Sequence, residues 1–257
     1  MYRAPTVKKA FQILELIAKR DKLLTISDLS RELDISKSTV HGIARALESA
    51  GAVVRDAKTK RYTLGMTLFD LTKAGHGHVD LKNIARPIIE DLMKSTKQSV
   101  FLGIRSGDHV SIIDIVESTQ DLKITAPVGT RLPLLAGAIG KAFLAAMDEN
   151  LADALIRTIG LREFTKNSIV DFNRYKKEVS EARSSGYGLD DEEYIPGVRA
   201  VAAVIQSPAE PMSAVWVVGF TPSMGAERMP DIAMETKRAA KAISQKIAFR
   251  PSHGQEK

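Results

Sequence analysis

Residues 33–51 read LDISKSTVHGIARALESAG, and this stretch decides the fold of the N-terminal part of the chain. Its front half holds small hydroxyl residues, a lysine and a histidine, whereas its back half carries apolar residues and stops at Gly51. The spacing predicts one helix that is capped by Ser36 or Ser38 and terminated by the glycine. The face expected to be buried consists of Val40, Ile43, Ala44, Leu47 and Ala50.

Two further helices are predicted before this one. Residues 7–19 place apolar side chains at helical spacing behind Thr6, a candidate N-cap, and a short helix is expected to begin at Ser27 as its cap. Only the residues LDIS separate that short helix from the next, so the connection must be a tight turn. Two helices joined in this way, the second with a polar front end, are typical of a helix-turn-helix motif.

In a helix-turn-helix motif the second helix enters the major groove of DNA by its N-terminal end. Its first turn must therefore offer hydrogen bonds to base edges and phosphates, and its free backbone N–H groups favour a nearby phosphate. A glycine on this helix leaves room for close approach of the duplex or of a neighbouring helix. The residues predicted to contact DNA are Ser36, Lys37, Ser38, Thr39, His41, Gly42 and Arg45.

A two-stranded hairpin is predicted directly after the recognition helix. Two short β patterns, Ala52–Arg55 and Arg61–Leu64, flank the polar turn Asp56–Lys60. A hairpin in this position is the wing of a winged helix, and cations around its tip would meet phosphate or the minor groove. The cations assigned to this role are Arg55, Lys58, Lys60 and Arg61.

The charge of the chain is concentrated in this N-terminal segment. Residues 1–61 hold 13 Lys and Arg against 7 Asp and Glu, an excess of six. The rest of the chain holds 24 of each sign, because the totals are 37 and 31. The pattern favours a polyanion-binding module joined to a neutral one, with chance and solvated helix faces as the alternative.

Composition limits the class of protein. The 257 residues are 44% apolar and include no cysteine, which excludes disulfides and thiolate zinc sites and favours a reducing, intracellular location. No apolar run approaches the roughly 18 residues of a membrane span. Charged residues also interrupt the N-terminal segment where a signal peptide would be apolar. We therefore expect a cytoplasmic protein without membrane association.

The remaining sequence predicts an α+β domain with an antiparallel sheet behind a linker helix. A helix over 66–77 ends in a glycine-rich break, and a second helix runs from Asp80 to Thr96. Strands are expected over 99–105, 109–117, 122–126, 197–206 and 212–220, and helices over 137–159 in two pieces, 171–185 and 225–249. The predicted divisions are a DNA-binding domain 1–65, a linker 66–78, an effector-binding and oligomerising domain 79–250, and a disordered tail 251–257.

Three motifs raise the alternative of an enzyme or a metal site. The run DDEE at 190–193 could supply paired carboxylates, but four consecutive acids cannot share one site and a solvated turn is the simpler interpretation. GAIGK at 137–141 lacks the first glycine of a phosphate loop, because Leu135 stands there. His76 and His78 have no acidic or cysteine partner at metal-binding spacing. No catalytic residue, cofactor or metal is predicted; the alternatives left open are a metabolic enzyme with an appended nucleic-acid-binding module and an architectural DNA-binding protein.

Three blocks of sequence, in order, resemble the IclR-type transcriptional regulators. They are LTISDLSRELDISKSTVHGIARALESAGAVVRDAKTKRYTLGMTLFDL, GTRLPLLAGAIGKAFLA at 129–145 and SGYGLDDEEYIPGVRAVAA at 185–203. The first block alone indicates only a winged helix, and the other two are more specific to the family. The resemblance implies a dimer or a dimer of dimers that binds a palindromic or repeated operator. It also implies a GAF-like C-terminal domain that senses a small metabolite, often a carboxylic acid.

The resemblance also implies a position for the effector pocket. Backbone N–H groups of Ala138 and Ile139 could hold a carboxylate, and Asp190 opens the acidic turn. Ala200 matches a position that is Cys in some relatives, and Val217 and Gly219 match positions that are Ser in relatives that bind small oxoacids. The implied effector residues are Ala138, Ile139, Gly140, Asp190, Ala200, Val217 and Gly219. With three polar groups replaced, a less polar and larger effector is expected, such as an aromatic or aliphatic acid; the alternative is that these positions merely pack the sheet.

Overall fold

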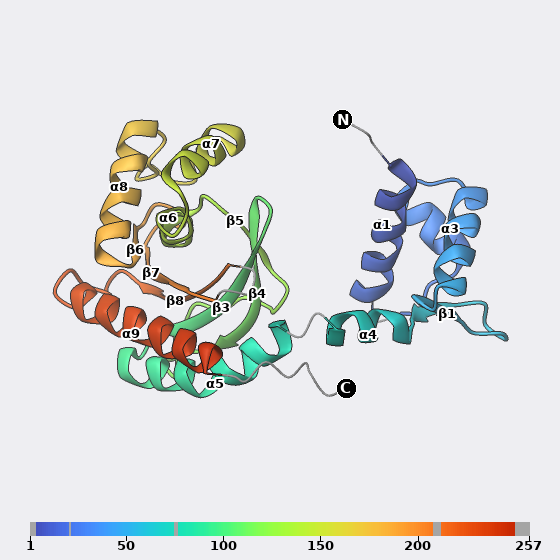
Figure 1. Cartoon of the computed structure of the whole chain (residues 1–257), viewed down its shortest axis with the longest axis horizontal. Coiled ribbons are helices and arrows are strands. Elements are labelled where there is room, and N and C mark those ends of the chain that lie inside the picture. The colour runs from blue at the N-terminus through green and yellow to red at the C-terminus, as the bar shows by residue number, and fades with distance from the viewer. Residues whose placement is uncertain (1–3, 21, 75–76, 208–211, 250–257) are drawn as a thin grey trace. The chain divides into compact units, whose positions relative to one another are not determined.

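The computed structural model describes residues 4–20, 22–74, 77–207 and 212–249 (Figure 1). Contacts divide the chain into two compact units, Met1–His76 and Gly77–Lys257. The predicted tail after Pro251 and the predicted break at 75–76 lie outside the described residues.

The N-terminal unit is a three-helix core with a two-stranded wing (Figure 1). Its elements are α1 Pro5–Lys19, α2 Ile26–Leu33, α3 Lys37–Ser49, β1 Val53–Arg55, β2 Tyr62–Leu64 and α4 Met66–Ala74. The helices bury Ile13, Leu29 and Val40 completely, and Tyr62 of the wing closes the same core. The predicted winged helix-turn-helix is confirmed, because the apolar stripes of all three helices meet in one cluster.

The two helix starts predicted before α3 lie slightly earlier than expected. Helix α1 begins at Pro5, whose fixed φ suits a first helical position, so Thr6 does not cap it. Helix α2 is capped by Thr25 rather than Ser27. The Thr25 side chain accepts from the Asp28 backbone N–H, and the Asp28 carboxylate accepts from the Thr25 backbone N–H. This reciprocal capping box satisfies two otherwise unpaired donors, which decides where α2 starts.

Both ends of α3 are fixed by local hydrogen bonds. Ser36 accepts from the backbone N–H of Thr39 and is the N-cap. At the other end Gly51 has a φ of +69°, and the backbone N–H of Ala52 donates to the Leu47 carbonyl at 2.8 Å. This is the Schellman arrangement predicted from the glycine, since a left-handed residue there lets the chain turn back onto the last carbonyls.

Helix α4 is joined to the end of α3. The hydroxyl of Thr67 donates to the Ala50 carbonyl at 2.8 Å, and the Thr67 backbone N–H donates to the Gly51 carbonyl at 3.3 Å. A Cβ at Gly51 would collide with the Thr67 hydroxyl. The first turn of α4 is therefore held directly against the C-terminus of α3.

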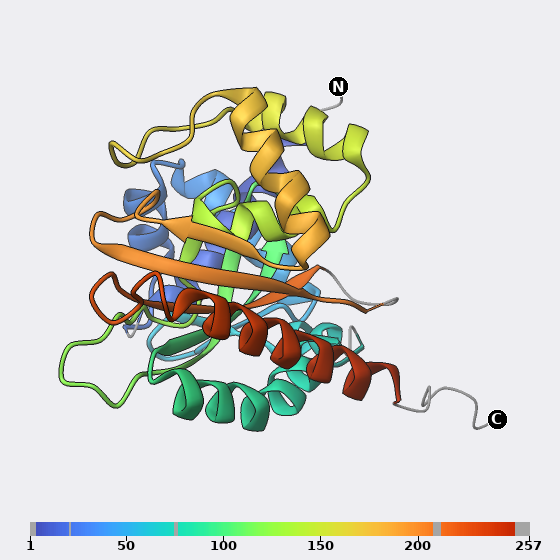
Figure 2. The same cartoon turned by 90° about the vertical axis from the view of Figure 1, so that its left-hand side faces the viewer.

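The C-terminal unit is a six-stranded antiparallel sheet with helices on both faces (Figures 1 and 2). Its strand order is β5-β4-β3-β8-β7-β6. The strands are β3 Ser99–Ser106, β4 His109–Val116, β5 Arg131–Pro133, β6 Gly188–Asp191, β7 Val198–Ile205 and β8 Ser213–Phe220. The helices are α5 Gly77–Thr96, α6 Gly137–Ala145, α7 Glu149–Ile159, α8 Phe172–Ser185 and α9 Met229–Ala248.

The sheet separates two apolar layers. Helices α5 and α9 lie side by side on one face and α6 packs on the other, with α7 and α8 outside it (Figure 2). The central strands β3, β7 and β8 are buried on both faces, so their sequences are almost continuously apolar. The predicted α+β class with an antiparallel sheet is confirmed.

One predicted strand is wrong. Residues 122–126 form no strand; after β4 the chain follows an irregular path and pairs with β4 only at β5. Within this segment Ile124 and Ala126 pack against the layer formed by α6. Their alternation was mistaken for a strand because a loop that covers a core also buries every second residue.

Candidate DNA interface and ligand cavity

Helix α3 presents four predicted DNA-contacting residues on one exposed face. Ser38, His41, Gly42 and Arg45 are all exposed and follow the i, i+3, i+4, i+7 spacing of a single helix face. The opposite face, with Val40 among its residues, is buried against α1 and α2. A Cβ at Gly42 would meet no atom within 4 Å, so the glycine is not required by packing within the chain's described residues.

The first turn of α3 divides its polar residues between the helix and the solvent. The Ser36 hydroxyl lies 2.8 Å from the Thr39 hydroxyl and 3.1 Å from that of Ser38, in addition to its capping bond. The hydroxyls of Ser36, Ser38 and half-buried Thr39 are thereby linked to one another, and the side chains of Ser36, Lys37 and Ser38 are exposed. The front of the helix offers both free side chains and backbone N–H groups to an anion.

The tip of the wing is ordered by one carboxylate. Asp56 Oδ1 accepts from the Thr59 backbone N–H at 2.6 Å, the Thr59 hydroxyl at 2.7 Å and the Lys58 backbone N–H at 3.1 Å. These hydrogen bonds, with that from the Thr59 backbone the largest influence, hold the pKa of Asp56 below its usual value. Lys58 and Lys60 project from this ordered turn and are exposed.

The other two wing cations, Arg55 and Arg61, directly flank this turn. The guanidinium of half-buried Arg55 lies 5.9 Å from the centroid of the ring of Tyr62, its partner on the opposite strand. Arg61 Nη1 donates to the carbonyl of Leu23, which lies between α1 and α2, at 2.8 Å. Both cations therefore adjoin the tip, as the sequence predicts, but their side chains also make contacts within the N-terminal unit.

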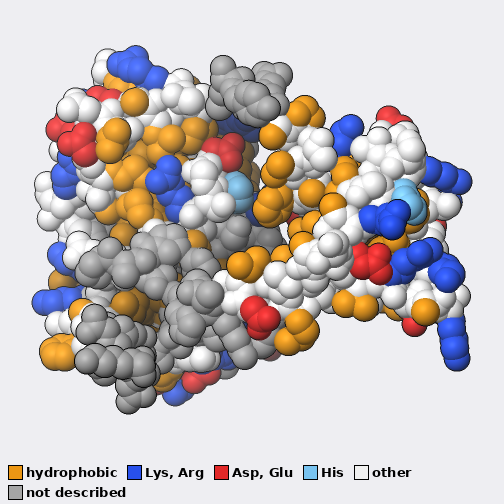
Figure 3. Space-filling view, turned by 45° about the vertical axis from the view of Figure 1, so that its right-hand side comes forward, with side chains coloured by type: hydrophobic (Ala, Val, Ile, Leu, Met, Phe, Trp, Pro, Cys, Tyr) orange, Lys and Arg blue, Asp and Glu red, His pale blue; other side chains and the backbone are white. Residues whose placement is uncertain are grey.

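The cations of the N-terminal unit gather on its surface, as the blue side chains of Figure 3 show. A surface with exposed lysines and arginines, a helix start and a hairpin tip fits the spaced phosphates of duplex DNA.

A cavity of about 130 Å³ lies in the C-terminal unit between the sheet and α6. Its wall is mostly apolar and includes the stacked rings of Phe101 and Trp216, whose centroids are 5.6 Å apart. The lining residues are Phe101, Ile112, Ile124, Thr125, Ala126, Leu132, Ala136, Ala138, Ile139, Asp190, Tyr194, Ile195, Val198, Ala200, Trp216 and Val218. An apolar cavity of roughly 150 Å³ holds benzene in another protein, so a small ring fits this space.

Asp190 is the charged residue in that wall. Its Oδ1 accepts from the Glu193 backbone N–H at 2.7 Å, and its carboxylate lies against the start of α6, where a Cβ at Gly137 would collide with it. Burial raises the pKa of Asp190 to about 6, and the carboxylate of Glu193 adds to this effect.

The cavity contains four of the seven predicted effector residues: Ala138, Ile139, Asp190 and Ala200. Gly140 lies one turn along α6 against Leu134, Leu135 and Tyr175, outside the lining.

Val217 and Gly219 are placed on the wrong face of the sheet by the sequence-based prediction. Val217 packs in the layer of α5 and α9, and a Cβ at Gly219 would meet Gln98. Side chains alternate along a strand, so the residues of β8 that face the cavity are Trp216 and Val218. The sequence contained no signal for this choice, because both faces of β8 are apolar.

The acidic run 190–193 is not a solvated turn. Asp190 and Glu193 are buried, and Asp190 lies in strand β6. Glu193 Oε1 and Glu178 Oε2 accept from Lys141 Nζ at 2.5 Å and 2.9 Å, and this lysine is only 1% exposed. The correction has a physical reason: buried Lys141 of α6 requires carboxylates at this position.

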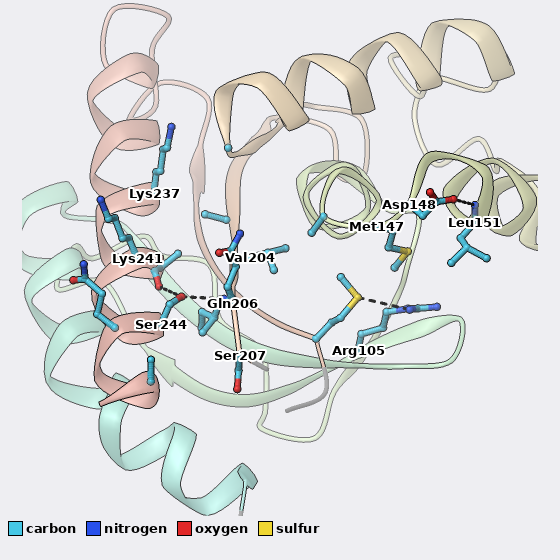
Figure 4. A pocket seen from close by; sticks show the side chains of 18 of the residues that line it. Arg105, Met147, Asp148, Leu151, Val204, Gln206, Ser207, Lys237, Lys241 and Ser244 are labelled. Atoms are coloured by element: carbon cyan, nitrogen blue, oxygen red, sulfur yellow. Dashed lines mark hydrogen bonds between the residues drawn. The ribbon is translucent and has the colours of Figure 1, made fainter. Parts of the chain in front are cut away.

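A larger hollow of about 1240 Å³ lies between α9, the end of β7 and the turn before α7 (Figure 4). Lys237 and Lys241 of α9 and Asp148 stand at its rim and are exposed, and Lys237 Nζ donates to the Ser185 carbonyl. It is an open groove that contains none of the predicted effector residues. We therefore take the smaller cavity between the sheet and α6 as the candidate effector site.

Comparison with known proteins identifies the family. The family model of the IclR helix-turn-helix domain matches residues 6–57, and that of the bacterial transcriptional regulator IclR C-terminal domain matches residues 74–245. The chain belongs to the IclR family of transcriptional regulators. An IclR regulator binds DNA through the helix-turn-helix and an effector through the C-terminal domain, so this protein is a regulator and not an enzyme.

Relatives match nearly the whole IclR chain. It is 28% identical over 250 residues to the HTH-type transcriptional repressor AllR of Klebsiella pneumoniae, covering 96% of this chain and 92% of that protein. The crystal structure of an IclR regulator from Alicyclobacillus acidocaldarius superposes with a TM-score of 0.74 and 26% identity, covering 96% and 100% of the two chains. An IclR homologue from Microbacterium hydrocarbonoxydans complexed with 4-hydroxybenzoate shares the fold, with a TM-score of 0.75, 20% identity and coverage of 95% and 100%.

Two further expectations concern metals and membranes. Across the described residues, no three His, Asp or Glu side chains converge to hold a metal ion. His76 and the side chain of His78 lie outside the described part of the chain. No helix among the described residues is long and apolar enough to span a bilayer.

Proposed function

We propose that this IclR regulator binds a two-fold symmetric operator as a dimer or dimer of dimers. When a small organic acid occupies the C-terminal cavity, the regulator dissociates from the operator or changes its arrangement on it. The observation that carries the DNA part is the exposed face of α3 formed by Ser38, His41, Gly42 and Arg45. One such module reads few base pairs, so pairing two modules multiplies affinity and favours half-sites about 34 Å apart. The repressor AllR is a relative, which favours repression as the sign of regulation.

The proposed DNA contacts divide into two groups. The α3 face reads bases, with Arg45 long enough to reach a guanine edge, and Lys37 beside it contacts phosphate. Lys58 and Lys60 at the ordered wing tip contact phosphate or the minor groove without reading sequence. Ser36 and Thr39 act by shaping the first turn, Arg55 by packing across the hairpin on Tyr62, and Arg61 by fixing the wing to the segment between α1 and α2.

The proposed effector is an organic acid with an apolar or aromatic body. The cavity size and the stacked Phe101 and Trp216 support a ring, and the start of α6 supports a polar group at one end. A homologue of the same fold that was crystallised with 4-hydroxybenzoate is consistent with this class. Trp216 and Val218 at the corrected positions strengthen the expectation of a less polar ligand.

We propose that residues 66–78 form the linker and residues 79–250 the effector-binding and oligomerising domain. We also propose that the protein acts in the cytoplasm. The hydrogen bond from Thr67 to the Ala50 carbonyl supports α4 as the physical route, because a change in the direction of α4 must move the end of α3. A coupling of about 1–3 kcal/mol would change operator occupancy five- to a hundredfold.

Two experiments test this function. In footprinting experiments on promoter DNA from the protein's own genome, the protein should protect two half-sites that lie one helical turn, or a multiple of it, apart. Uniform protection of all DNA would favour an architectural binder instead. A thermal-shift screen of acids should show stabilisation by aromatic or aliphatic acids. Stabilisation by glyoxylate or pyruvate, but by no bulkier acid, contradicts the proposed effector class.

A further inference from the structure

The cavity has an electrostatic character that does not suit a second carboxylate. Asp190 stands in its wall, and its carboxylate already lies against the start of α6, the place that would attract an anionic ligand. The remaining lining residues are apolar or uncharged. An acid that enters this cavity as an anion therefore meets another, buried carboxylate among mostly apolar side chains, where repulsion between like charges is stronger than in water.

The residues packed around Asp190 do not supply a free cation. Lys141 of α6 is the buried cation nearby, and its ammonium donates to both Glu193 after β6 and Glu178 of α8. Tyr175 of α8 donates its hydroxyl to the Leu135 carbonyl at 3.3 Å. One lysine thus faces three carboxylates in this cluster, so the cluster with all groups ionised carries two negative charges in excess before any ligand arrives.

We propose that an acidic effector binds with uptake of one proton from solvent, which is held on the Asp190 carboxyl and donated as an O–H···O hydrogen bond to the effector carboxylate. This inference rests on the proposed organic-acid effector and adds that its affinity is linked to pH through this single residue. Protonated Asp190 converts a repulsive pair into a hydrogen-bonded one, because a carboxylic acid donates where a carboxylate can only accept.

The proton is available near neutrality. Burial, reinforced by the Glu193 carboxylate, raises the pKa of Asp190 to about 6, so a fraction of the free protein already carries this proton at physiological pH. Lys141 and the backbone N–H groups of Glu193 and Tyr194 act in the opposite direction, and burial prevails.

The chain contains its own reporter for the test. Trp216 is the single tryptophan of the sequence and lines the same cavity as Asp190, so its fluorescence reports occupancy without a label. Benzoate and benzamide are suitable probes, because they share a ring and differ in charge. Each is titrated into the full-length protein at about pH 5.5 and about pH 7.5, where benzoate is ionised throughout.

Benzoate should bind the wild-type protein about twentyfold more weakly at the higher pH, whereas benzamide should change less than about twofold. In Asp190→Asn the benzoate affinity should become independent of pH and exceed that of the wild type at the higher pH. The matched control is Asp191→Asn, whose residue is exposed, pairs with Arg199 and follows Asp190 on the same strand; it should keep the wild-type pH dependence. Calorimetry of the wild type in two buffers of different ionisation enthalpy should show uptake of close to one proton per benzoate at the higher pH.

The outcomes separate this inference from the function on which it rests. Equal benzoate affinity at both pH values in the wild type, or a pH dependence that survives in Asp190→Asn, overturns proton uptake while leaving an acid-binding cavity. No response of Trp216 to either probe at either pH in any variant overturns the cavity as the site for a planar acid, and the proton-linked inference fails with it. Neither result affects operator binding by α3.

Discussion

The starts of α3 and α6 place the same chemical group in opposite surroundings. Both present free backbone N–H groups, but α3 begins on the surface with Ser36 as its cap, whereas α6 begins in a buried layer with no side-chain cap and with Asp190 against it. At α3 the neighbouring cation Lys37 is exposed; at α6 the cation Lys141 is buried between carboxylates.

The difference shows how one chain can treat exposed and buried charges in different ways. An exposed charge stays hydrated and is available to a large polyanion such as DNA. Binding then releases the counterions that were associated with the DNA phosphates. A buried charge must be compensated inside the protein before any ligand arrives. Substitutions in the C-terminal unit should therefore change mainly stability and pH dependence, and those on α3 mainly DNA affinity.

Removal of the buried cation should have the largest effect. Lys141→Ala leaves buried Glu193 and half-buried Glu178 without this partner, so we expect the free energy of unfolding of the C-terminal unit to fall by about 3–5 kcal/mol. Urea denaturation followed by Trp216 fluorescence measures this. Lys176→Ala is the control, because its exposed pairs with Glu149 and Asp153 should contribute no more than about 1 kcal/mol. If Lys141→Ala lowered the free energy of unfolding by no more than Lys176→Ala does, Lys141, Glu178 and Glu193 would not depend on one another for stability.

Removal of the buried acid should stabilise the protein, and the sign follows from its pKa. The pKa of Asp190 is about 6 in the folded protein against 3.8 for an unperturbed aspartate, so the folded protein holds the proton more tightly and its stability falls as pH rises through this window. The free energy of unfolding of Asp190→Asn should therefore exceed that of the wild type by up to about 3 kcal/mol above neutral pH, and this difference should vanish below about pH 4. Urea denaturation of both proteins above neutral pH and below about pH 4 measures the difference, and a difference that is constant with pH contradicts the expectation.

Truncation of the long side chain on the α3 face should act on binding alone. Arg45→Ala is expected to weaken operator binding by about 1–3 kcal/mol if the guanidinium reads a base, with no loss of stability because the residue is exposed. Fluorescence anisotropy against specific and scrambled duplexes measures the change. The control is Lys94→Ala in the C-terminal unit, which pairs only at the surface with Asp91. A loss that is equal on both duplexes would assign Arg45 to phosphate instead.

Gly42 separates packing from DNA contact on the same helix. Gly42→Ala should raise the free energy of unfolding by about 0.5–1 kcal/mol, since alanine favours a helix and the space beside Gly42 is open. The added methyl should weaken operator binding if the duplex approaches α3 closely there. Thermal denaturation and anisotropy test the two effects independently, and stabilisation with unchanged affinity would place the duplex away from Gly42.

The wing tip should show the smallest effect. Lys58→Ala is expected to reduce affinity on all sequences alike and to lower the slope of log K against log salt by about 0.9, the value for one lost phosphate contact. Titration at several salt concentrations measures this slope. An unchanged slope would mean that the wing does not touch phosphate.

Local sequence was sufficient for the DNA-reading unit. The apolar stripe of α3, the hydroxyl residues at its start and Gly51 at its end act within a few residues of one another, so the helix, its cap and its exposed face could all be predicted. The errors there, at the starts of α1 and α2, arose where more than one residue could begin the helix. Arg61 contacts Leu23, which only the folded unit brings near it.

The sequence by itself determined the class of each unit, its helices, its four long strands and the helix that we propose reads DNA, because periodicity and capping are short-range properties of the chain. Tertiary structure alone decided which face of β8 meets the cavity and why Asp190 and Glu193 are buried. A strand that is apolar on both faces carries no hydropathy signal for its orientation. The burial of Glu193 is explained by Lys141, which is 52 residues away in the sequence and adjacent in space.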